Sequence, residues 1–313
     1  MFRQGTSRRA ILTAAVGAGL APALSWAQDR NTPSPVARSE TATTDLLRLL
    51  DPAERLTAQV SVNGRGPYAF LVDTGADNSA ISMELADALG LARAGRTVLH
   101  GVAGSAVVDE VVVASMRSGR RERADMRVPV VPRQNLGADG LLGLDWLAGN
   151  NVMLDYSRRR MTIAPHLPLP RGDTFTVPAK TQRNGLTLID AVIPGVALTA
   201  FIDSGSTTTI GNLALLRAAK AHEAILGSAL DLRLKSVTGQ EMSGTVAILS
   251  FLRIGPVQIR AVPVVMGPIH TFDYWGLTDR PALLIGADVL QKFRSVALDF
   301  KRGEFRFSMT GLN

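Results

Sequence analysis

The amino-acid sequence predicts an all-β, bilobal protein made of two duplicated, β-rich lobes with short helices. Apolar runs with strand-like alternation, bounded by Gly, Pro or Asn, follow one another along most of the 313-residue chain. The order of these runs in the first half returns in the second half, and each half carries one Asp-hydroxyl-Gly motif directly after an apolar run. Two copies of one unit on a single chain predict pseudo-two-fold packing, which brings equivalent positions near the axis together.

The first copy begins with a predicted hairpin, 56–62 and 68–72, that leads into Asp73. A helix is expected at 82–90, because Ser82 is a suitable N-cap and a Gly closes the stretch. The remaining elements are two strands separated by a charged loop at 117–123, then a buried strand running into a short helix, and a last hairpin. They occupy 107–114, 126–131, 140–147 and 152–163.

The second copy repeats this order, with a hairpin that leads into Asp203 and a longer helix at 212–226. Its insertion at 269–280 has no counterpart in the first copy and concentrates aromatic residues on an expected loop, which either packs or rims a cleft. The other elements of this copy are expected at 186–193, 198–202, 246–254, 259–265, 282–290 and 296–307.

The first 27 residues predict export. Ser7-Arg8-Arg9 precedes an Ala/Gly-rich apolar run and a small-x-small cleavage pattern, so 1–27 is expected to be a twin-arginine signal peptide rather than a stable membrane anchor. The protein is then periplasmic or extracellular. A flexible leader is expected at 28–52, with a short helix at 44–50 within it. The N-terminal lobe is expected at 53–165, a Pro-rich linker at 166–173 and the C-terminal lobe at 174–313.

Composition excludes several classes of site. The absence of Cys excludes disulfides, Cys-ligated zinc and thiol catalysis. Loss of the three Arg of the signal lowers the formal charge from +7 to +4, and no basic run with aromatics suggests nucleic-acid binding. The four His have no metal-ligand spacing, so we expect surface or turn positions and no metal or other cofactor. They are His100, His166, His222 and His270.

If Asp73 and Asp203 meet at the axis, they share one proton, because two adjacent carboxylates do not both ionise easily. The charged member can deprotonate a water molecule, and the neutral member can protonate the carbonyl that the water attacks. This chemistry hydrolyses a peptide bond without a covalent intermediate.

Asp73-Thr74-Gly75-Ala76-Asp77 and Asp203-Ser204-Gly205-Ser206, each followed by an apolar-apolar-Gly element, resemble the retropepsin-like and pepsin-like aspartic proteases over 53–313. The length fits a duplicated retropepsin-like unit. The resemblance implies that Asp73 and Asp203 are the catalytic pair and that Thr74 and Ser204 lock the motifs together. It also implies that Gly75 and Gly205 let a substrate backbone approach.

The same resemblance places flap-like hairpins at 100–104 and 236–239. Substrate-binding residues are therefore expected in the first motif, in both hairpins and in the aromatic insertion. They are Asp77, His100, Gly101, Ser236, Val237, Tyr274 and Trp275. The chain departs from the family at Leu144 and Ala287, where retroviral enzymes carry an Arg that supports the second acid, and neither flap carries the Tyr of pepsin-like enzymes.

Other charged residues have simpler expected roles. Asp145 and Asp288 are expected to be helix N-caps, and Asp155 and Asp299 solvated ion-pair or turn residues. The Arg158-Arg159-Arg160 run is expected to be a solvated tip.

The residue after each Gly makes the pair asymmetric. Ser206 can donate its hydroxyl to Asp203, whereas Ala76 has none to offer Asp73. A hydrogen bond to a carboxylate favours its charged form, so Asp203 is expected to carry the charge and Asp73 the proton.

The sequence thus predicts an exported, monomeric aspartic endopeptidase that acts on extended peptide or protein substrates. The alternative is a catalytically silent peptide-binding or scaffold protein of the same fold. A carbohydrate-active enzyme would place its carboxylates at separate strand ends.

Overall fold

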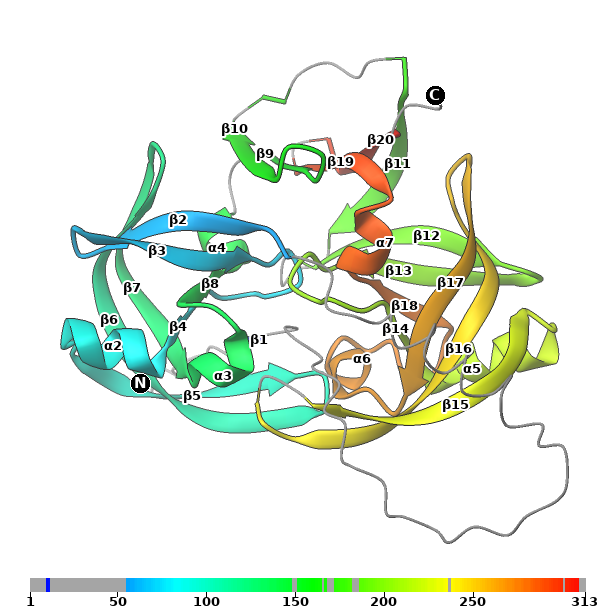
Figure 1. The fold of residues 1–313 in the computed structure, drawn as a ribbon, viewed down its shortest axis with the longest axis horizontal. Helices are drawn as coiled ribbons and strands as arrows, with labels where there is room; N and C mark the ends of the chain where they lie inside the picture. The colour runs from blue at the N-terminus through cyan, green and yellow to red at the C-terminus, as the bar shows by residue number, and fades with distance from the viewer. Residues whose placement is uncertain are drawn as a thin grey trace, which may run out of the picture.

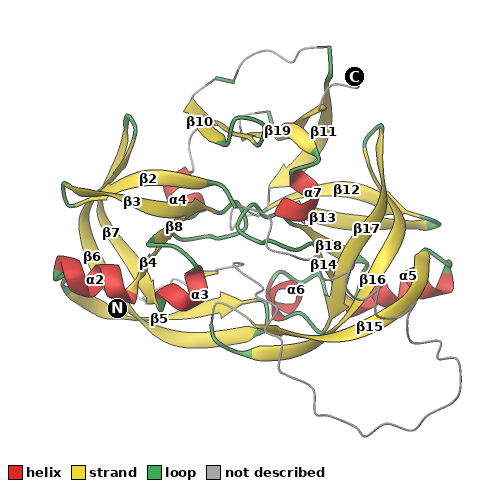
Figure 2. Cartoon of the chain, in the orientation of Figure 1, coloured by secondary structure: helices red, strands yellow, loops and turns green. Residues whose placement is uncertain are grey.

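The computed structural model describes residues 10–11, 55–147, 151–164, 166–167, 172–181, 186–235, 238–300 and 302–309 (Figure 1). The described chain is mostly strand with a few short helices, arranged as two lobes with loops meeting between them (Figure 2). The predicted all-β, two-lobe fold is confirmed. The predicted helix at 44–50, the leader and nearly all of the predicted signal lie outside the described residues. No helix in the described ranges is long and apolar enough to cross a membrane.

Both copies contain the same twelve elements in the same order. The first copy comprises β2 (Thr57–Val62), β3 (Arg65–Val72), β4 (Ala80–Ser82), α2 (Met83–Leu89), β5 (Arg93–Gly101), β6 (Gly104–Ser118), β7 (Arg121–Val131), α3 (Arg133–Leu136), β8 (Gly140–Leu142), α4 (Leu144–Leu147), β9 (Asn151–Asp155) and β10 (Arg160–Ala164). The second comprises β12 (Thr187–Ile193), β13 (Val196–Ile202), β14 (Ile210–Asn212), α5 (Leu213–Ala221), β15 (Ile225–Lys235), β16 (Glu241–Ile254), β17 (Val257–Gly267), α6 (His270–Tyr274), β18 (Ala282–Ile285), α7 (Ala287–Leu290), β19 (Phe293–Asp299) and β20 (Glu304–Met309). Two further strands, β1 (Ala10–Ile11) and β11 (Thr174–Thr181), complete the list.

Strand pairing repeats with the sequence. In the first copy β3 pairs in parallel with β8 and β4 with β7; in the second, β13 pairs in parallel with β18 and β14 with β17. The strands that carry the acidic motifs, β3 and β13, are therefore interior strands of their sheets. Apolar side chains such as Phe70 and Phe201 are fully buried near the ends of these two strands, which explains the continuous apolar run just before each Asp.

The two copies are joined by a sheet on their common axis. The strand order β10-β9-β19-β20-β11 links the last hairpin of each copy (Figure 1). In the antiparallel β9–β19 ladder, Val152 lies opposite Leu298 and Leu154 opposite Val296. Val152 and Val296 are equivalent in the two copies, as are Leu154 and Leu298, so the ladder is symmetric about the axis.

The β5–β6 and β15–β16 hairpins meet on the opposite side of the central loops from this joining sheet (Figure 1). Gln240 of the second copy donates from Nε2 to the carbonyl of Ser105 in the first, at 3.1 Å. The strand β1 adds in parallel to β5, with Ala10 opposite Leu99 and Ile11 opposite His100.

Three element predictions were wrong in detail. The second long helix ends at Ala221, not at 226, because β15 begins at Ile225 and pairs with β16. The charged loop expected at 117–123 is mostly strand, since β6 and β7 continue to a tight turn around Gly119. The aromatic insertion is not a loop without a counterpart: it forms α6, and α3 occupies the same place in the first copy.

Candidate active site

Each aspartate follows directly after a buried strand, and the neighbouring strand holds its backbone. The amide of Asp73 donates to the carbonyl of Leu142 and that of Asp203 to the carbonyl of Ile285, both at 3.0 Å. Each carboxylate then turns back onto its own motif: Gly75 N donates to Asp73 Oδ1 at 2.8 Å and Gly205 N to Asp203 Oδ1 at 2.9 Å. The Asp-hydroxyl-Gly sequence thus supplies an amide donor to an otherwise buried acid.

The two motifs are bound to each other by their hydroxyl residues. Thr74 Oγ1 donates to the carbonyl of Ile202 at 2.9 Å, and Ser204 Oγ donates to the carbonyl of Val72 at 2.7 Å. Each hydroxyl oxygen also accepts the backbone amide of the other residue at 3.2 Å. Four buried hydrogen bonds therefore hold the lobes together at the axis, and each hydroxyl both donates and accepts.

The structure brings Asp73 and Asp203 together in a fully buried position. A side chain at Gly205 would overlap the Asp73 carboxyl group, so only glycine lets the motifs approach this closely. The pKa of Asp73 lies well above its ordinary value, chiefly because burial disfavours the charged form and also because of the Asp203 charge and a hydrogen bond between the two carboxyl groups. One proton is therefore shared by the pair.

The hydrogen bonds to the two acids are unequal, but not for the reason expected. Ser206 Oγ donates to the carbonyl of Thr208 at 2.8 Å, so the prediction that this hydroxyl donates to Asp203 is wrong. A hydroxyl has one hydrogen to donate. Instead the backbone amide of Ser206 donates to Asp203 Oδ1 at 3.0 Å, beside that of Gly205. In the described hydrogen bonds Asp203 Oδ1 thus accepts two amides and Asp73 Oδ1 one.

Arg55 is a residue of the site that the sequence did not reveal. It precedes β2, and its guanidinium donates to the carbonyl of Leu136 at 2.9 Å and to that of Gly205, in the other lobe, at 3.4 Å. Its positive charge interacts with both aspartates and opposes the rise in the pKa of Asp73. A single Arg ahead of a strand carries no motif, so no sequence signal distinguished it.

Asp77, expected to bind substrate, lies at the end of the first motif with a buried Oδ1 atom that has no hydrogen-bond partner in the described part of the chain. Its pKa is raised from 3.8 to about 7, first by burial and then by the negative charge of Asp145. The carboxyl group is therefore neutral below neutral pH, in a chain that lacks the supporting Arg of retroviral enzymes.

Asp145 and Asp288 are not N-caps. They lie inside the first turns of α4 and α7, and their carboxylates accept from the hydroxyl groups of Ser79 and Thr209, each at 2.7 Å. The same hydroxyl oxygens accept the amides of Gly143 and Gly286, each at 3.1 Å. No side chain fits at either Gly, because the backbone of the loop after each motif lies against it. This explains the apolar-apolar-Gly element of each copy: it clamps the loop that follows the catalytic motif.

Asp155 and Asp299 are turn residues, as expected, but they are buried rather than solvated. Each accepts the amide of the residue three positions later, at 2.9 and 3.1 Å. Asp299 also accepts from the buried Arg306 at 2.7 Å. The Arg158-Arg159-Arg160 tip is exposed.

The tip of the first hairpin is docked onto the second lobe. His100, expected at the surface or in a turn, is buried; its ring stacks on His270 and contacts Tyr274, with 3.0 Å between His100 Nδ1 and His270 Nε2. The side chain of Val102 lies in the apolar cluster that includes Trp275, and its carbonyl accepts the amide of His270 at 2.9 Å.

This docking places several of the expected substrate-binding residues. Gly101 lies in the docked tip, and Tyr274 borders it, whereas Trp275 is buried in the cluster. Ser236 and Val237 lie outside the described residues. Within the described ranges, no three His, Asp or Glu side chains gather closely enough to hold a metal ion.

The comparison with protein families agrees with this geometry. Residues 58–146, from β2 to α4 and including Asp73, match a family described as aspartyl protease. The match covers less than a third of the chain and does not reach Asp203. No curated protein matches the chain. The match supports an aspartyl protease family for this protein.

Proposed function

We propose that the chain is an aspartic endopeptidase that hydrolyses peptide bonds with a water molecule activated between Asp73 and Asp203. The observation that carries this proposal is the pair of buried carboxyl groups, one from each copy, held together by the reciprocal contacts of Thr74 and Ser204. The family match of the first copy supports the same chemistry.

The roles of the two acids follow from their hydrogen bonds. Asp203, which accepts two backbone amides, holds the negative charge and takes a proton from the water. Asp73, whose pKa is raised by burial and by its neighbour, holds the proton and gives it to the carbonyl oxygen of the scissile bond. Collapse of the resulting tetrahedral intermediate breaks the C–N bond, and the amine leaves with a proton returned from the pair.

The substrate is an extended peptide. Docked hairpin tips lie over the central loops, and the edge strand β5 accepts the extended segment β1 at Leu99 and His100. A peptide that adds to this edge gains backbone hydrogen bonds irrespective of its sequence, and pockets for alternate side chains then select among peptides. Substrate entry requires the tip of the first hairpin to leave its contacts with His270 and Tyr274.

The finer assignments are part of this proposal. The two copies of one unit suit a single-chain, duplicated retropepsin-like enzyme that needs no second subunit for its dyad, hence a monomer with two lobes divided near 166–173. Export through the signal at 1–27 rests on sequence alone. Replacing Arg8 and Arg9 with Lys is expected to leave the protein in the cytoplasm, which cell fractionation measures.

The experiment that tests the activity compares the wild type with Asp73→Asn and Asp203→Asn on a fluorogenic peptide library at acidic and neutral pH. Both variants keep the shape of the side chain, and the cleavage rate of each is expected to be lower than that of the wild type by more than about a thousandfold. Asp190→Asn, an exposed residue of β12, is the control and should cleave as the wild type does. Equal cleavage by wild type and dyad variants would contradict the proposal, and folded proteins that bind but never cleave peptides would indicate the silent binding protein instead.

A further inference from the structure

The outer edge of the joining sheet differs between the two copies. In the second copy β11 pairs along β20, with Val177 opposite Phe305. In the first copy β10 is the equivalent of β20, and it ends the strand order of the sheet in the part of the chain that the structure describes. An edge strand presents a row of backbone N–H and C=O groups to which another strand can add. The first copy therefore offers a pairing edge at the place where the second copy holds a strand.

The turn beside this edge is open in the first copy as well. The β16–β17 turn lies against β11, because a side chain added at Gly255 would meet Val177 and Phe175. Gly119 holds the equivalent place in the β6–β7 turn, and a side chain added there would meet none of the described residues within 4 Å. The space that β11 fills in the second copy is thus empty of described residues in the first.

This space is a groove of about 700 Å³ between the β6–β7 turn and β10. Its lining residues are 118–122, Trp146 and 160–163. The guanidinium of Arg121 lies 5.3 Å from the centre of the buried Trp146 ring and donates to the carbonyl of Trp146 at 2.8 Å. Met161 and Ile163 are half-buried and pack against the core of the first lobe. The groove therefore has an apolar floor and one arginine held in place above it.

The lining of the groove is basic. It includes Arg120, Arg121 and Arg160 but a single carboxylate, that of Glu122. Within the described ranges, no carboxylate lies at ion-pair distance from Arg120 or Arg160. Burial and the positive charge of Arg123 lower the pKa of Arg121, as expected where cations gather. An anionic group in the groove would relieve this repulsion.

The equivalent positions of the second copy are not basic. Pro256, Val257 and Glu304 stand where the first copy has Arg120, Arg121 and Arg160. The strand that lies there, β11, accordingly presents apolar side chains such as Val177, which is buried. The change in lining indicates that the groove of the first copy suits an acidic strand rather than an apolar one.

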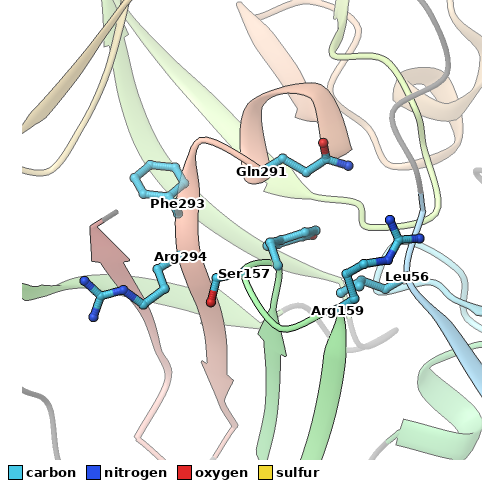
Figure 3. A pocket seen from close by; sticks show the side chains of 7 residues that line it. Leu56, Ser157, Arg159, Gln291, Phe293 and Arg294 are labelled. Carbon is cyan, nitrogen blue, oxygen red and sulfur yellow. The ribbon is translucent and has the colours of Figure 1, made fainter. Parts of the chain in front are cut away.

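A smaller cavity of about 280 Å³ lies next to the β9–β10 turn, but its charge is already balanced in part. Figure 3 shows Arg159 and Arg294 on opposite sides of this cavity. Arg294 forms an ion pair with Asp173 at 2.6 Å. The groove beside β10, where Arg120 and Arg160 have no such carboxylate, is therefore the stronger site for an anionic ligand.

We propose that the groove between β10 and the β6–β7 turn binds an extended, acidic peptide segment of another protein, which adds to β10 as a strand. The pairing of β11 with β20 shows that this fold accepts a strand at the equivalent edge. Backbone hydrogen bonds supply affinity irrespective of sequence. Acidic side chains at alternate positions lie on one face of the added strand and supply the carboxylates that arginine forks bind best.

The partner is expected to be a different protein, because a second copy of this chain, with a formal charge of +7, would bring two basic surfaces together. The groove contains no residue of the two Asp-hydroxyl-Gly motifs, so its occupancy does not depend on the proposed peptidase activity.

The test measures binding of a fluorescein-labelled peptide of about eight residues, in which Glu alternates with Val, by fluorescence polarisation. The full-length protein carries Asp73→Asn, so that any peptidase activity leaves the probe intact. We expect a Kd of about 1–100 μM, which weakens at least tenfold when the ionic strength rises from about 0.05 M to about 0.5 M. Arg120→Glu combined with Arg160→Glu should weaken binding at least about tenfold. Arg217→Glu, an exposed change in α5 of the second copy, should leave the Kd within about twofold.

A second peptide separates strand addition from charge attraction. Replacing the Val residues of the probe with Pro keeps its charge but removes every second N–H donor, so binding should weaken at least about tenfold. Hydrogen exchange gives the matching observation on the protein: amides within 160–164 should exchange more slowly once the Glu–Val peptide is added.

Several results would overturn the inference. They are the absence of binding, equal binding by the folded Arg120→Glu and Arg160→Glu protein, and equal binding of the Pro-containing peptide. Slow exchange within 160–164 before any peptide is added would also overturn it, because the groove would then hold another part of this chain or a second copy; light scattering distinguishes these two occupants. If the double variant does not fold, Arg160→Gln decides, with an expected loss of about threefold in affinity.

Discussion

Replacing Asp77 with Asn should make the protein more resistant to unfolding at alkaline pH. In the folded state this carboxyl group ionises at about pH 7, because it is buried and faces Asp145. In the unfolded chain it ionises near its ordinary value of 3.8. The folded state thus binds an extra proton between these values, and its stability declines as the pH rises through that window.

The expected magnitude follows from the two pKa values. Each pKa unit corresponds to about 1.4 kcal/mol, so between about pH 5 and about pH 8 ionisation of Asp77 lowers the free energy of unfolding by about 3 kcal/mol. Asn removes the ionisation while keeping the shape. Urea unfolding of wild type and variant at both pH values measures the difference, with Asp190→Asn, an exposed carboxylate, as the control.

The advantage of Asp77→Asn over the wild type should therefore be larger at about pH 8 than at about pH 5 by about 3 kcal/mol, and the control should show no pH-dependent difference. A difference between wild type and Asp77→Asn that is the same at both pH values would refute the reasoning. It would mean that the carboxyl group is satisfied in its charged form in solution.

Three further predictions concern the dyad and the hairpin tip. Arg55→Met should raise the alkaline limb of the pH–activity profile by about half to one unit, because it removes a cation that opposes the raised pKa of Asp73. Arg55→Lys keeps the positive charge and should leave the limb near its wild-type position. An unmoved limb in a folded Arg55→Met protein would contradict this role of Arg55. Gly205→Ala should abolish cleavage, because the added methyl group overlaps the Asp73 carboxyl group, and full activity in a purified variant would show that the motifs do not approach so closely. His270→Ala should speed amide exchange at 100–104 at a fixed pH, because the ring of His100 loses the partner on which it stacks and with which it hydrogen-bonds. Exchange at the wild-type rate would contradict the docking of the hairpin tip.

The sequence predicted the parts of the site that repeat. Asp73 and Asp203 were identified because each follows a buried strand and carries the same hydroxyl-Gly pair, and the structure brings them to one axis. The helix after Ser82 was expected from its capping residue and the helix after Asn212 from the repeated order of elements, and the side chains of both residues do cap. Local patterns of this kind survive tertiary packing because the hydrogen bonds that define them are local.

What the sequence did not predict depends on contacts between distant segments. The stacking of His100 on His270 joins residues 170 positions apart, and the reach of Arg55 to Gly205 joins residues 150 apart. No sequence spacing predicts either of these two contacts. The acceptor of the Ser206 hydroxyl could not be predicted from the sequence either, because it depends on the local turn geometry. The hydroxyl donates to the carbonyl of Thr208. The end of the helix after Ala221 was missed since pairing of β15 with β16 outweighs helical periodicity.

The joining sheet sets the time at which a dyad can exist during synthesis. Its last strand, β20, lies between β19 and β11, so the sheet that holds both copies on one axis is complete only after residues 304–309 have been made. Domains generally fold as units while the chain emerges, and the first lobe can fold early. The first lobe carries only Asp73 of the proposed catalytic pair. Until β20 has been made, a nascent chain therefore lacks the sheet that holds the catalytic pair on one axis, and we expect no cleavage of its own unfolded segments or of its neighbours.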